Sequence, residues 1–336
     1  LSPHSLVFPA RSQSLIRFAF RSLRSSSVVD ILLVHNATKL VKMKSFTQAL
    51  SIAAGLSLSF ASPTPEISSR QNGSKNLLVF GDSYSTVGFW PGGTLPAAGN
   101  PLGNPALPGQ TTSSGLNWVG HLTSTLNTSL VLTYDFAVTG ATTDKDIVDT
   151  YAQYCVDDQV GQYTQYVSSK VDKANTLVAV WIGINDVGEP FWDKESAPVT
   201  KIMDRYFQLL QTLADDGLTN FVLLTVPPFS DQIPAMIGQS ETDLARLRSD
   251  ITSYNQALQD RLATFKSSNS GVKGLVFDTK PSFDTVVENF AKYGAKDATC
   301  YGSSDCLWAD NYHAGLAIHK LLAENLVKGV AENFVF

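Results

Sequence analysis

The stretch that decides the fold is residues 76–88, which read NLLVFGDSYSTVG. It opens with the apolar run Leu77–Phe80, the pattern of a short strand buried on both faces of a parallel sheet. Gly81, Asp82 and Ser83 follow at once, and a glycine at this point permits a sharp turn. Parallel sheets carry their chemistry at the carboxyl ends of the strands, so Ser83 is a candidate nucleophile. An ordinary turn after a buried strand is the alternative interpretation of the same residues.

Further short apolar runs follow this stretch, and segments with helical spacing separate them. The predicted strands are Leu77–Phe80, Val131–Val138, Thr176–Ile182, Phe221–Val226 and Gly274–Phe277. The predicted helices are Asn117–Leu126, Asp157–Lys170, Pro198–Asp215, Glu241–Phe265, Ser282–Tyr293 and Ala314–Phe334. Strands that alternate with helices, without an internal repeat, predict one α/β domain with a parallel sheet and helices on both faces.

Composition narrows the classes of partner. The chain has 336 residues, of which 43% are hydrophobic and 16% charged, enough for one large α/β domain or two small ones. Residues 1–61 hold seven Lys or Arg and one acid, whereas the remainder has 11 more acidic than basic residues. A net acidic domain argues against nucleic acid or an anionic membrane as partner. Because no run reaches 18 apolar residues, we also expect no stable membrane association.

The first methionine, Met43, opens a basic start followed by the apolar run Ala49–Phe60. This is the pattern of a secretory signal peptide, so we expect a secreted, extracellular protein. The preceding residues are Ser- and Arg-rich and are interpreted as a gene-model extension, with a transit peptide as the alternative. The expected organisation is an extension (1–42), a signal peptide (43–61), a linker (62–75) and one α/β domain (76–336).

The three cysteines allow at most one disulfide. Cys300 and Cys306 lie close in sequence, and secretion favours oxidation, so we expect this pair to be bridged and Cys155 to be a free thiol. Asn72 and Asn127 begin Asn-x-Ser/Thr sequons and are candidate glycosylation sites. No Cys/His spacing typical of a metal site is present, so we expect no metal.

Two later strand ends carry residues that suit the same site as Ser83. Gly140 follows the second predicted strand, where its backbone N–H could approach a ligand, and Asn185 follows the third, where its side-chain amide could do so. Ordinary turn roles are the alternative for both residues. His313 lies at a loop-to-helix boundary, three residues after Asp310, and that spacing can place the carboxylate beside the imidazole.

Four short blocks of this sequence resemble, in order, the four blocks of the SGNH, or GDSL, hydrolase superfamily. They are Gly81-Asp82-Ser83, Gly140, Gly183-x-Asn185-Asp186 and Asp310-x-x-His313. The resemblance extends from Asn76 to the C-terminus. It implies a three-layer αβα sandwich with a parallel, flavodoxin-like sheet. It also implies that Ser83 is the nucleophile, His313 the base and Asp310 the residue that orients it. Ser83 N–H, Gly140 N–H and the Asn185 side chain would form the oxyanion hole. Tyr84 departs from the Leu in the family name, at a position that is not catalytic.

Three stretches are similar to fungal secreted acetylesterases of carbohydrate esterase family 16: GDSYSTVGF at 81–89, NPLGNP at 100–105 and NWVG at 117–120. This resemblance implies a serine esterase, without cofactor or metal, that removes acetyl groups from hemicellulose fragments. Its partner would be a small ester or an acetylated oligosaccharide. A GDSL lipase or lysophospholipase is the alternative enzyme, because fold alone does not separate these activities. An inactive carbohydrate-binding protein is the alternative from another class, and the four intact blocks argue against it.

The Pro- and Gly-rich loop at residues 90–115 directly follows the nucleophile turn, and we interpret it as a wall of the substrate cleft. Its asparagines and glutamine, with Asn117, could hydrogen-bond sugar hydroxyls. Trp90, Trp118 and Trp308 are candidates for stacking on a sugar ring, with packing in the core as the alternative. Because this loop has few large apolar residues, we expect acetyl esters to be preferred over esters of long fatty acids.

Overall fold

The computed structural model describes residues 73–335 of the chain. The predicted extension, the predicted signal peptide, most of the predicted linker and the Asn72 sequon lie outside these residues. Lys75, assigned to the linker, is the first residue of strand β1, so the sheet begins one residue before the predicted domain start. In the described part of the chain, none of the helices combines the length and the apolar character needed to cross a membrane.

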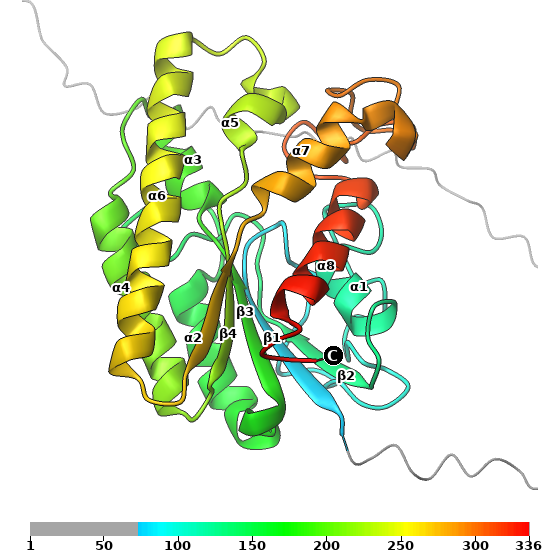
Figure 1. Cartoon of the computed structure of the whole chain (residues 1–336), viewed down its shortest axis with the longest axis vertical. Coiled ribbons are helices and arrows are strands. Elements are labelled where there is room, and N and C mark those ends of the chain that lie inside the picture. Colours follow the sequence, from blue (N-terminus) through cyan, green and yellow to red (C-terminus); the bar gives the residue numbers. More distant parts are fainter. Residues whose placement is uncertain (1–72, 336) are drawn as a thin grey trace, which may run out of the picture. The chain divides into compact units, whose positions relative to one another are not determined.

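The described residues form a five-stranded sheet in the order β2-β1-β3-β4-β5, with every neighbouring pair parallel (Figure 1). The strands are β1 (Lys75–Gly81), β2 (Val131–Asp135), β3 (Thr176–Trp181), β4 (Asn220–Leu224) and β5 (Lys273–Phe277). The predicted α/β class and flavodoxin-like order are therefore confirmed. The chain runs from β1 to one neighbour, β2, and then to the other, β3, and such a reversal opens a crevice at the carboxyl ends of the strands.

Helices cover both faces of the sheet, which gives the three predicted layers (Figure 1). One face carries α1 (Trp118–Ser124), α7 (Lys280–Glu288) and α8 (Leu316–Val330). The other carries α2 (Val156–Tyr166), α4 (Val199–Asp215) and α6 (Glu241–Ser268), with α3 (Ile184–Trp192) packed on α6. The short helix α5 (Phe229–Gln232) also contacts α6.

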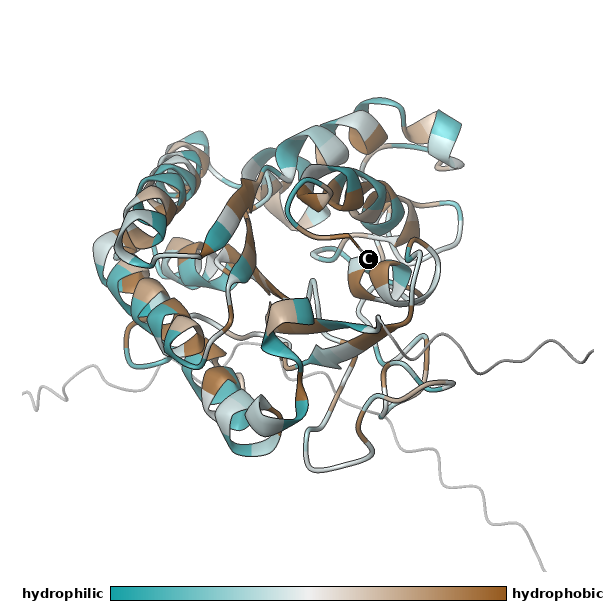
Figure 2. Cartoon of the chain, turned by 60° about the horizontal axis from the view of Figure 1, so that its bottom comes forward, coloured by the Kyte–Doolittle hydropathy of each residue, from teal (hydrophilic) through white to brown (hydrophobic). Residues whose placement is uncertain are grey.

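The core lies between the sheet and these helices. Leu77–Phe80 is completely buried and all residues of β3 are buried, which explains the continuous apolar runs in these strands. Figure 2 shows hydrophobic and hydrophilic residues alternating along the outer helices. In α6 the buried apolar positions recur every three or four residues: Leu247, Ile251, Tyr254, Leu258, Leu262 and Phe265. Burial of these apolar stripes against the sheet is the main stabilising contribution to the fold.

The structure differs from the predicted elements mainly at their ends. The second strand ends at Asp135 rather than Val138, where the Asp135 carboxylate accepts the Ala137 N–H at 3.0 Å, although the N–H groups of Phe136 and Val138 still donate to carbonyls of β1. Helices α3 and α5 were not predicted. Helix α3 has only nine residues and contains Pro190, so its sequence resembles a turn after the third strand.

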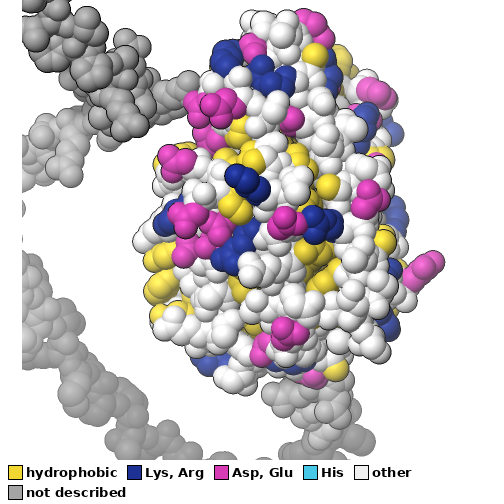
Figure 3. Space-filling view, turned by 90° about the vertical axis from the view of Figure 1, so that its left-hand side faces the viewer, with side chains coloured by type: hydrophobic (Ala, Val, Ile, Leu, Met, Phe, Trp, Pro, Cys, Tyr) yellow, Lys and Arg dark blue, Asp and Glu magenta, His cyan; other side chains and the backbone are white. Residues whose placement is uncertain are grey.

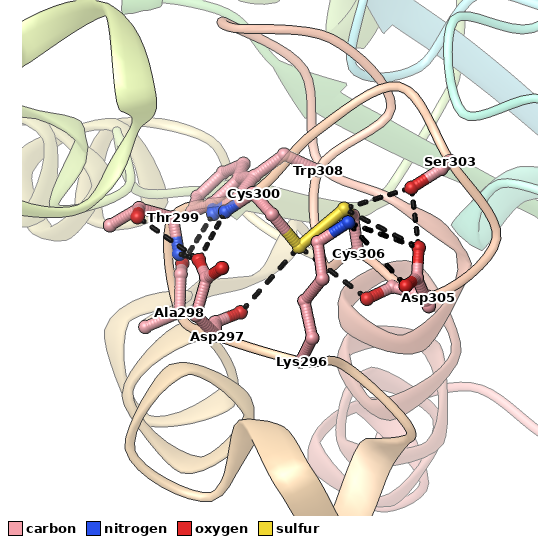
Figure 4. The surroundings of a disulfide bond; sticks show 9 residues. All are labelled: Lys296, Asp297, Ala298, Thr299, Cys300, Ser303, Asp305, Cys306 and Trp308. Carbon is pink, nitrogen blue, oxygen red and sulfur yellow. Dashed lines mark hydrogen bonds and ion pairs between the residues drawn. A yellow bond between two sulfur atoms is a disulfide. The ribbon is translucent and has the colours of Figure 1, made fainter.

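A disulfide joins Cys300 to Cys306, with 5.1 Å between their Cα atoms (Figure 4). Cys155 is a buried free thiol. Lys296 and Asp305 form an ion pair at 3.4 Å beside the disulfide. The indole of Trp308 donates a 2.9 Å hydrogen bond to the Ala298 carbonyl. These links fasten the loop between α7 and α8 ahead of Asp310.

Charges of both signs are interspersed on the face that Figure 3 shows, the left-hand side of the view in Figure 1. Three ion pairs of the α4–α6 side illustrate this mixing: Arg205–Asp144 at 2.8 Å, Lys194–Asp243 at 2.7 Å and Arg261–Asp204. Exposed pairs such as Arg261–Asp204 contribute little to stability. On this face there is accordingly no large field of a single sign.

Candidate active site

The sheet topology brings the motif residues to one edge. Ser83 follows β1, Gly140 follows β2 and Asn185 lies in the first turn of α3, just after β3. Because these three strands are neighbours and parallel, their carboxyl ends lie side by side. The fourth motif, which contains Asp310 and His313, lies in the loop before α8.

Ser83, His313 and Asp310 form a continuous hydrogen-bonded chain. The Ser83 hydroxyl lies 2.9 Å from His313 Nε2, and His313 Nδ1 lies 2.7 Å from Asp310 Oδ2. Ser83 is 4% exposed, so its hydroxyl lies in a largely dry environment. Of the histidines that the structure describes, His313 alone is within hydrogen-bond distance of this hydroxyl: His121 contacts Thr125 and His319 is buried in the core. This is the arrangement of a nucleophile, a base and an orienting carboxylate.

The Asp310 carboxylate is held in its charged form. Its other oxygen, Oδ1, accepts the backbone N–H groups of Tyr312 and His313, both at 2.8 Å. Although burial raises the pKa of Asp310, the hydrogen bond and charge of His313 and these two N–H groups outweigh it and lower that pKa below its usual value. An anionic Asp310 can fix the imidazole orientation and stabilise the imidazolium that forms during a reaction.

The turn that carries Ser83 requires glycine at position 81. Gly81 has φ +159°, and a Cβ there would collide with the carbonyl oxygen of Trp181 on β3. The buried Gln159 side chain clamps the same residue: it accepts the Gly81 N–H at 2.9 Å and donates to the Gly81 carbonyl at 2.8 Å. Sequence reasoning missed Gln159, because nothing in the pattern of the predicted helix 157–170 distinguishes it.

Two consecutive residues of α3 hold the loop after β2. The Asn185 amide donates to the Ala141 carbonyl at 2.8 Å, and the Asp186 carboxylate accepts the Thr143 N–H at 3.0 and 3.2 Å. This loop contains Gly140, whose φ of +81° is one that side chains other than glycine rarely adopt. An amide nitrogen carries two hydrogens, so Asn185 can bind Ala141 with one and a ligand with the other.

Two buried carboxyl groups lie beneath the site. Burial raises the pKa of Asp82 to about 8. The hydrogen bond from the Tyr84 N–H lowers this pKa, and the nearby Asp186 carboxylate raises it by a smaller amount. Burial likewise raises the pKa of Asp186 to about 7, although hydrogen bonds from Thr143 lower it. The Asp82 carboxyl is therefore largely protonated at neutral pH.

The expectation that Trp118 and Trp308 stack on a substrate is wrong. Trp118 is completely buried and Trp308 is 1% exposed, so both belong to the core. Trp118 donates its indole N–H to the Ser85 hydroxyl at 3.3 Å. Trp90 is 44% exposed and lies flat against Tyr154, with 6.4 Å between ring centroids.

The 90–115 loop reaches the nucleophile, since the Thr112 hydroxyl donates to the Ser83 carbonyl at 2.7 Å. Its asparagines, however, are engaged with the loop itself: Asn100 donates to the Gly103 carbonyl, and Asn104 donates to the carbonyls of Trp90 and Thr94. Asn117 is buried and caps α1. The interpretation of these asparagines as sugar-binding groups is therefore not supported. Across residues 73–335, no group of three or more His, Cys, Asp or Glu side chains is arranged to hold a metal ion.

Comparison with known proteins agrees with this geometry. Residues 77–326 match the family model described as GDSL-like Lipase/Acylhydrolase. An acetylesterase of Thermothelomyces thermophilus is 44% identical over 260 residues, which cover 74% of this chain and 86% of that protein. An acetylesterase of Hypocrea jecorina is 30% identical over 169 residues, 45% of this chain and 47% of that protein.

Among solved structures, an acetylxylan esterase of Geobacillus stearothermophilus aligns with a TM-score of 0.48 and 17% identity, covering 78% of this chain and 96% of that one. The family match spans most of the chain and all four motifs, and it agrees with the resemblance drawn from those motifs. The chain therefore belongs to the GDSL-like lipase/acylhydrolase family of ester hydrolases.

Proposed function

We propose that this protein is a secreted serine esterase that removes acetyl groups from carbohydrate esters derived from hemicellulose. The observation that carries the proposal is the chain of contacts from Ser83 Oγ to His313 Nε2 at 2.9 Å and from His313 Nδ1 to Asp310 at 2.7 Å. The acetyl specificity is supported by the acetylesterase that is 44% identical over most of the chain.

In the first half of the reaction, Ser83 Oγ attacks the ester carbonyl while His313 Nε2 accepts its proton. Asp310 keeps Nδ1–H in place, so that Nε2 is the free acceptor. The carbonyl oxygen becomes an oxyanion, which the N–H groups of Ser83 and Gly140 and the Asn185 amide stabilise. His313 then gives its proton to the leaving alcohol oxygen, and an acetyl-Ser83 intermediate remains.

In the second half, a water molecule attacks the acetyl-Ser83 carbonyl and His313 accepts a proton from that water. The same donors stabilise the second oxyanion. When the intermediate collapses, His313 returns the proton to Ser83 Oγ and acetic acid leaves, which ionises to acetate in solution. Apart from the ester and this water molecule, the proposed steps use only groups of the protein.

Secretion and glycosylation are part of this proposal and rest on the sequence. The apolar segment at 49–60 supports export, and the half-buried Asn127 begins the sequon that lies in the described part of the chain. Expression in a fungal host tests both points: we expect enzyme in the medium with an N-terminus close to residue 62, and a mass that falls on deglycosylation. Enzyme retained inside the cell with residues 43–61 intact would contradict secretion.

Activity is tested with Ser83→Ala and with two substrates side by side, acetylated xylan fragments and a lysophospholipid. We expect the wild-type protein to release acetate from the fragments, and Ser83→Ala to lose on the order of 10⁴-fold in kcat while keeping its circular dichroism spectrum. A well-folded Ser83→Ala variant with near-native turnover would overturn the mechanism. Release of fatty acid in preference to acetate would favour the lipase alternative.

A further inference from the structure

Tyr151 lies directly against the glycine of the proposed oxyanion hole. A Cβ atom added to Gly140 would meet the Tyr151 ring at 2.6 Å from Cζ and its hydroxyl oxygen at 2.9 Å. The neighbouring Thr150 fixes this arrangement, because its hydroxyl donates to the Gly140 carbonyl at 2.6 Å and accepts the Ala152 N–H at 3.2 Å. These bonds hold the backbone on either side of Tyr151, so the residue is anchored beside Gly140.

The Tyr151 side chain is nevertheless 78% exposed, the largest value among the large apolar side chains exposed within residues 73–335. One part of the ring contacts Gly140 while most of its surface faces solvent. This is the reverse of Trp118 and Trp308, which are buried in the core. A fixed and exposed aromatic ring next to the proposed reacting centre offers a flat surface to a ligand.

Two polar side chains, Tyr312 and Glu189, lie on the α3 side of this ring. A Cβ on Gly188 of α3 would lie 2.8 Å from the Tyr312 hydroxyl, so Tyr312, which precedes His313, faces α3. Glu189 follows on the same helix, one turn after Asn185. Desolvation, which for Tyr151 is confined to the hydroxyl end packed against Gly140, raises the pKa of both Tyr151 and Tyr312, and the Glu189 carboxylate is the next cause for each.

We propose that Tyr151 is the platform on which the sugar ring of the substrate stacks, with Tyr312 and Glu189 at its edge to hydrogen-bond the sugar hydroxyls. This inference rests on the proposed function and names the subsite for the alcohol part of the ester. A saccharide on this platform has its acetyl group beside the Gly140 N–H, where the oxyanion would form. The Glu189 carboxylate repels anions, so the subsite selects neutral acetylated sugars over sugars that carry a uronate.

The test compares Tyr151→Ala and Tyr151→Phe on two substrates, a neutral acetylated xylo-oligosaccharide and ethyl acetate, which has no sugar. We expect Tyr151→Ala to raise KM for the oligosaccharide about tenfold, the size of a lost stacking interaction. Its kcat/KM for ethyl acetate should stay within about twofold of wild type. Tyr151→Phe keeps the ring and should keep the oligosaccharide KM within about threefold.

Tyr301→Ala provides the matched control, since Tyr301 is 55% exposed and lies within the disulfide loop; its KM values should not change. A second variant, Glu189→Gln, tests the selection against anions. It should raise the ratio of kcat/KM for a uronate-bearing acetylated oligosaccharide to kcat/KM for the neutral one.

An unchanged oligosaccharide KM in Tyr151→Ala would overturn the platform. An equal loss of kcat/KM on the oligosaccharide and on ethyl acetate would overturn it as well, because it would show that Tyr151 only shapes Gly140. A tenfold rise in Trp90→Ala instead would assign the platform to Trp90. If the wild-type protein hydrolyses ethyl acetate but no acetylated oligosaccharide, the proposed function fails as well, and these outcomes are therefore distinguishable.

Discussion

The hydroxyl of Tyr84 donates a 2.6 Å hydrogen bond to the backbone carbonyl of Tyr312, and this bond joins the turn of Ser83 to the loop of His313. Tyr84 is 2% exposed, and its ring lies 5.8 Å from the His313 imidazole, centroid to centroid. The residue next to the proposed nucleophile thus contacts the residue next to the proposed base. Since Leu cannot make this bond, the departure from the family name at this position has a structural consequence.

We expect Tyr84→Phe to lower kcat about tenfold with little change in KM. The ring remains, but the His313 loop loses its fixed distance from Ser83, and small misplacements of reacting groups reduce rates strongly. Tyr163→Phe is the matched control, because the hydroxyl of this buried tyrosine donates to Asp216 in an ion-pair cluster away from the site. Both variants should lose about 1 kcal/mol of unfolding free energy.

Steady-state kinetics and thermal denaturation of the two variants check this expectation. Equal kcat values for Tyr84→Phe and Tyr163→Phe, at equal stability, would mean that the Tyr84 bond is structural only.

The second prediction concerns the proposed oxyanion donor. We expect Asn185→Ala to lower kcat by roughly 10²–10³-fold with KM nearly unchanged, because a donor aimed at the developing charge acts mainly in the transition state. The substitution also removes the bond to the Ala141 carbonyl. Thr150→Ala removes a comparable bond to the Gly140 carbonyl but leaves the three proposed oxyanion donors in place, so it should reduce kcat less than about tenfold.

Rates over a range of concentrations of one acetate ester separate kcat from KM for both variants. An effect of Asn185→Ala confined to KM would make Asn185 a substrate-binding residue, and equal losses in the two variants would make it a support for the loop.

The placement of Ser83, Gly140 and Asn185 at one edge followed from the sequence, because adjacent parallel strands bring their carboxyl ends together. His313 comes from the loop before α8, 230 positions after Ser83, and the resemblance to the hydrolase superfamily predicted its role; its Nε2 lies 2.9 Å from Ser83 Oγ. Tyr151 and Gln159 were not predicted, because their contacts with Gly140 and Gly81 depend on the path of one loop and the face of one helix. Periodicity and turn residues do not encode such paths.

Trp118 and Trp308 show the same limit of prediction from sequence. Trp118 and Trp308 flank the site in sequence, but a large apolar side chain gains more from burial than from exposure. Whether an aromatic residue packs in the core or faces a ligand is decided by tertiary packing, and a single sequence does not report it.

The third prediction is a pH dependence of stability that arises from Asp82. Its pKa is raised by burial from 3.8 to about 8 in the folded protein, so the native state binds a proton that the unfolded state releases between about pH 4 and pH 8. The stabilisation from this proton is complete below pH 4 and is lost as the pH rises towards 8. Asp82→Asn keeps an oxygen that accepts the Tyr84 N–H, at 2.9 Å in the wild type, and carries no charge.

We therefore expect the difference in melting temperature, Asp82→Asn minus wild type, to be several degrees larger at pH 8 than at pH 5. Each kcal/mol of unfolding free energy corresponds to roughly 2–4 °C. Differential scanning calorimetry at the two pH values measures this difference. Parallel curves for the two proteins would show that Asp82 is not protonated at neutral pH in the folded state.

The last prediction concerns the acyl group. We expect kcat/KM to fall steadily as the acyl chain of a nitrophenyl ester lengthens from acetate to octanoate. A lipase gains about 0.8 kcal/mol for each methylene it buries in an apolar groove beside the nucleophile. Between Gly92 and Gly115 the large apolar residues are leucines: Leu102 is completely buried, and Leu95 and Leu107 are half-buried against the core. These side chains are already packed within the protein, so this loop has little apolar surface to line such a groove.

One exposed apolar side chain does lie near the base: Leu316, three residues after His313, is 49% exposed and contacts the end of the loop at Gly115. If a long acyl chain were bound, Leu316 would be the first residue to meet it. Leu316→Ala should leave acetate hydrolysis within about twofold of wild type. A wild-type maximum at octanoate that Leu316→Ala abolishes would overturn the acetyl preference and identify a lipase groove. A steady decline in both proteins is the expected result, because without a groove each added methylene gains no buried contact and must fit against the walls of the site.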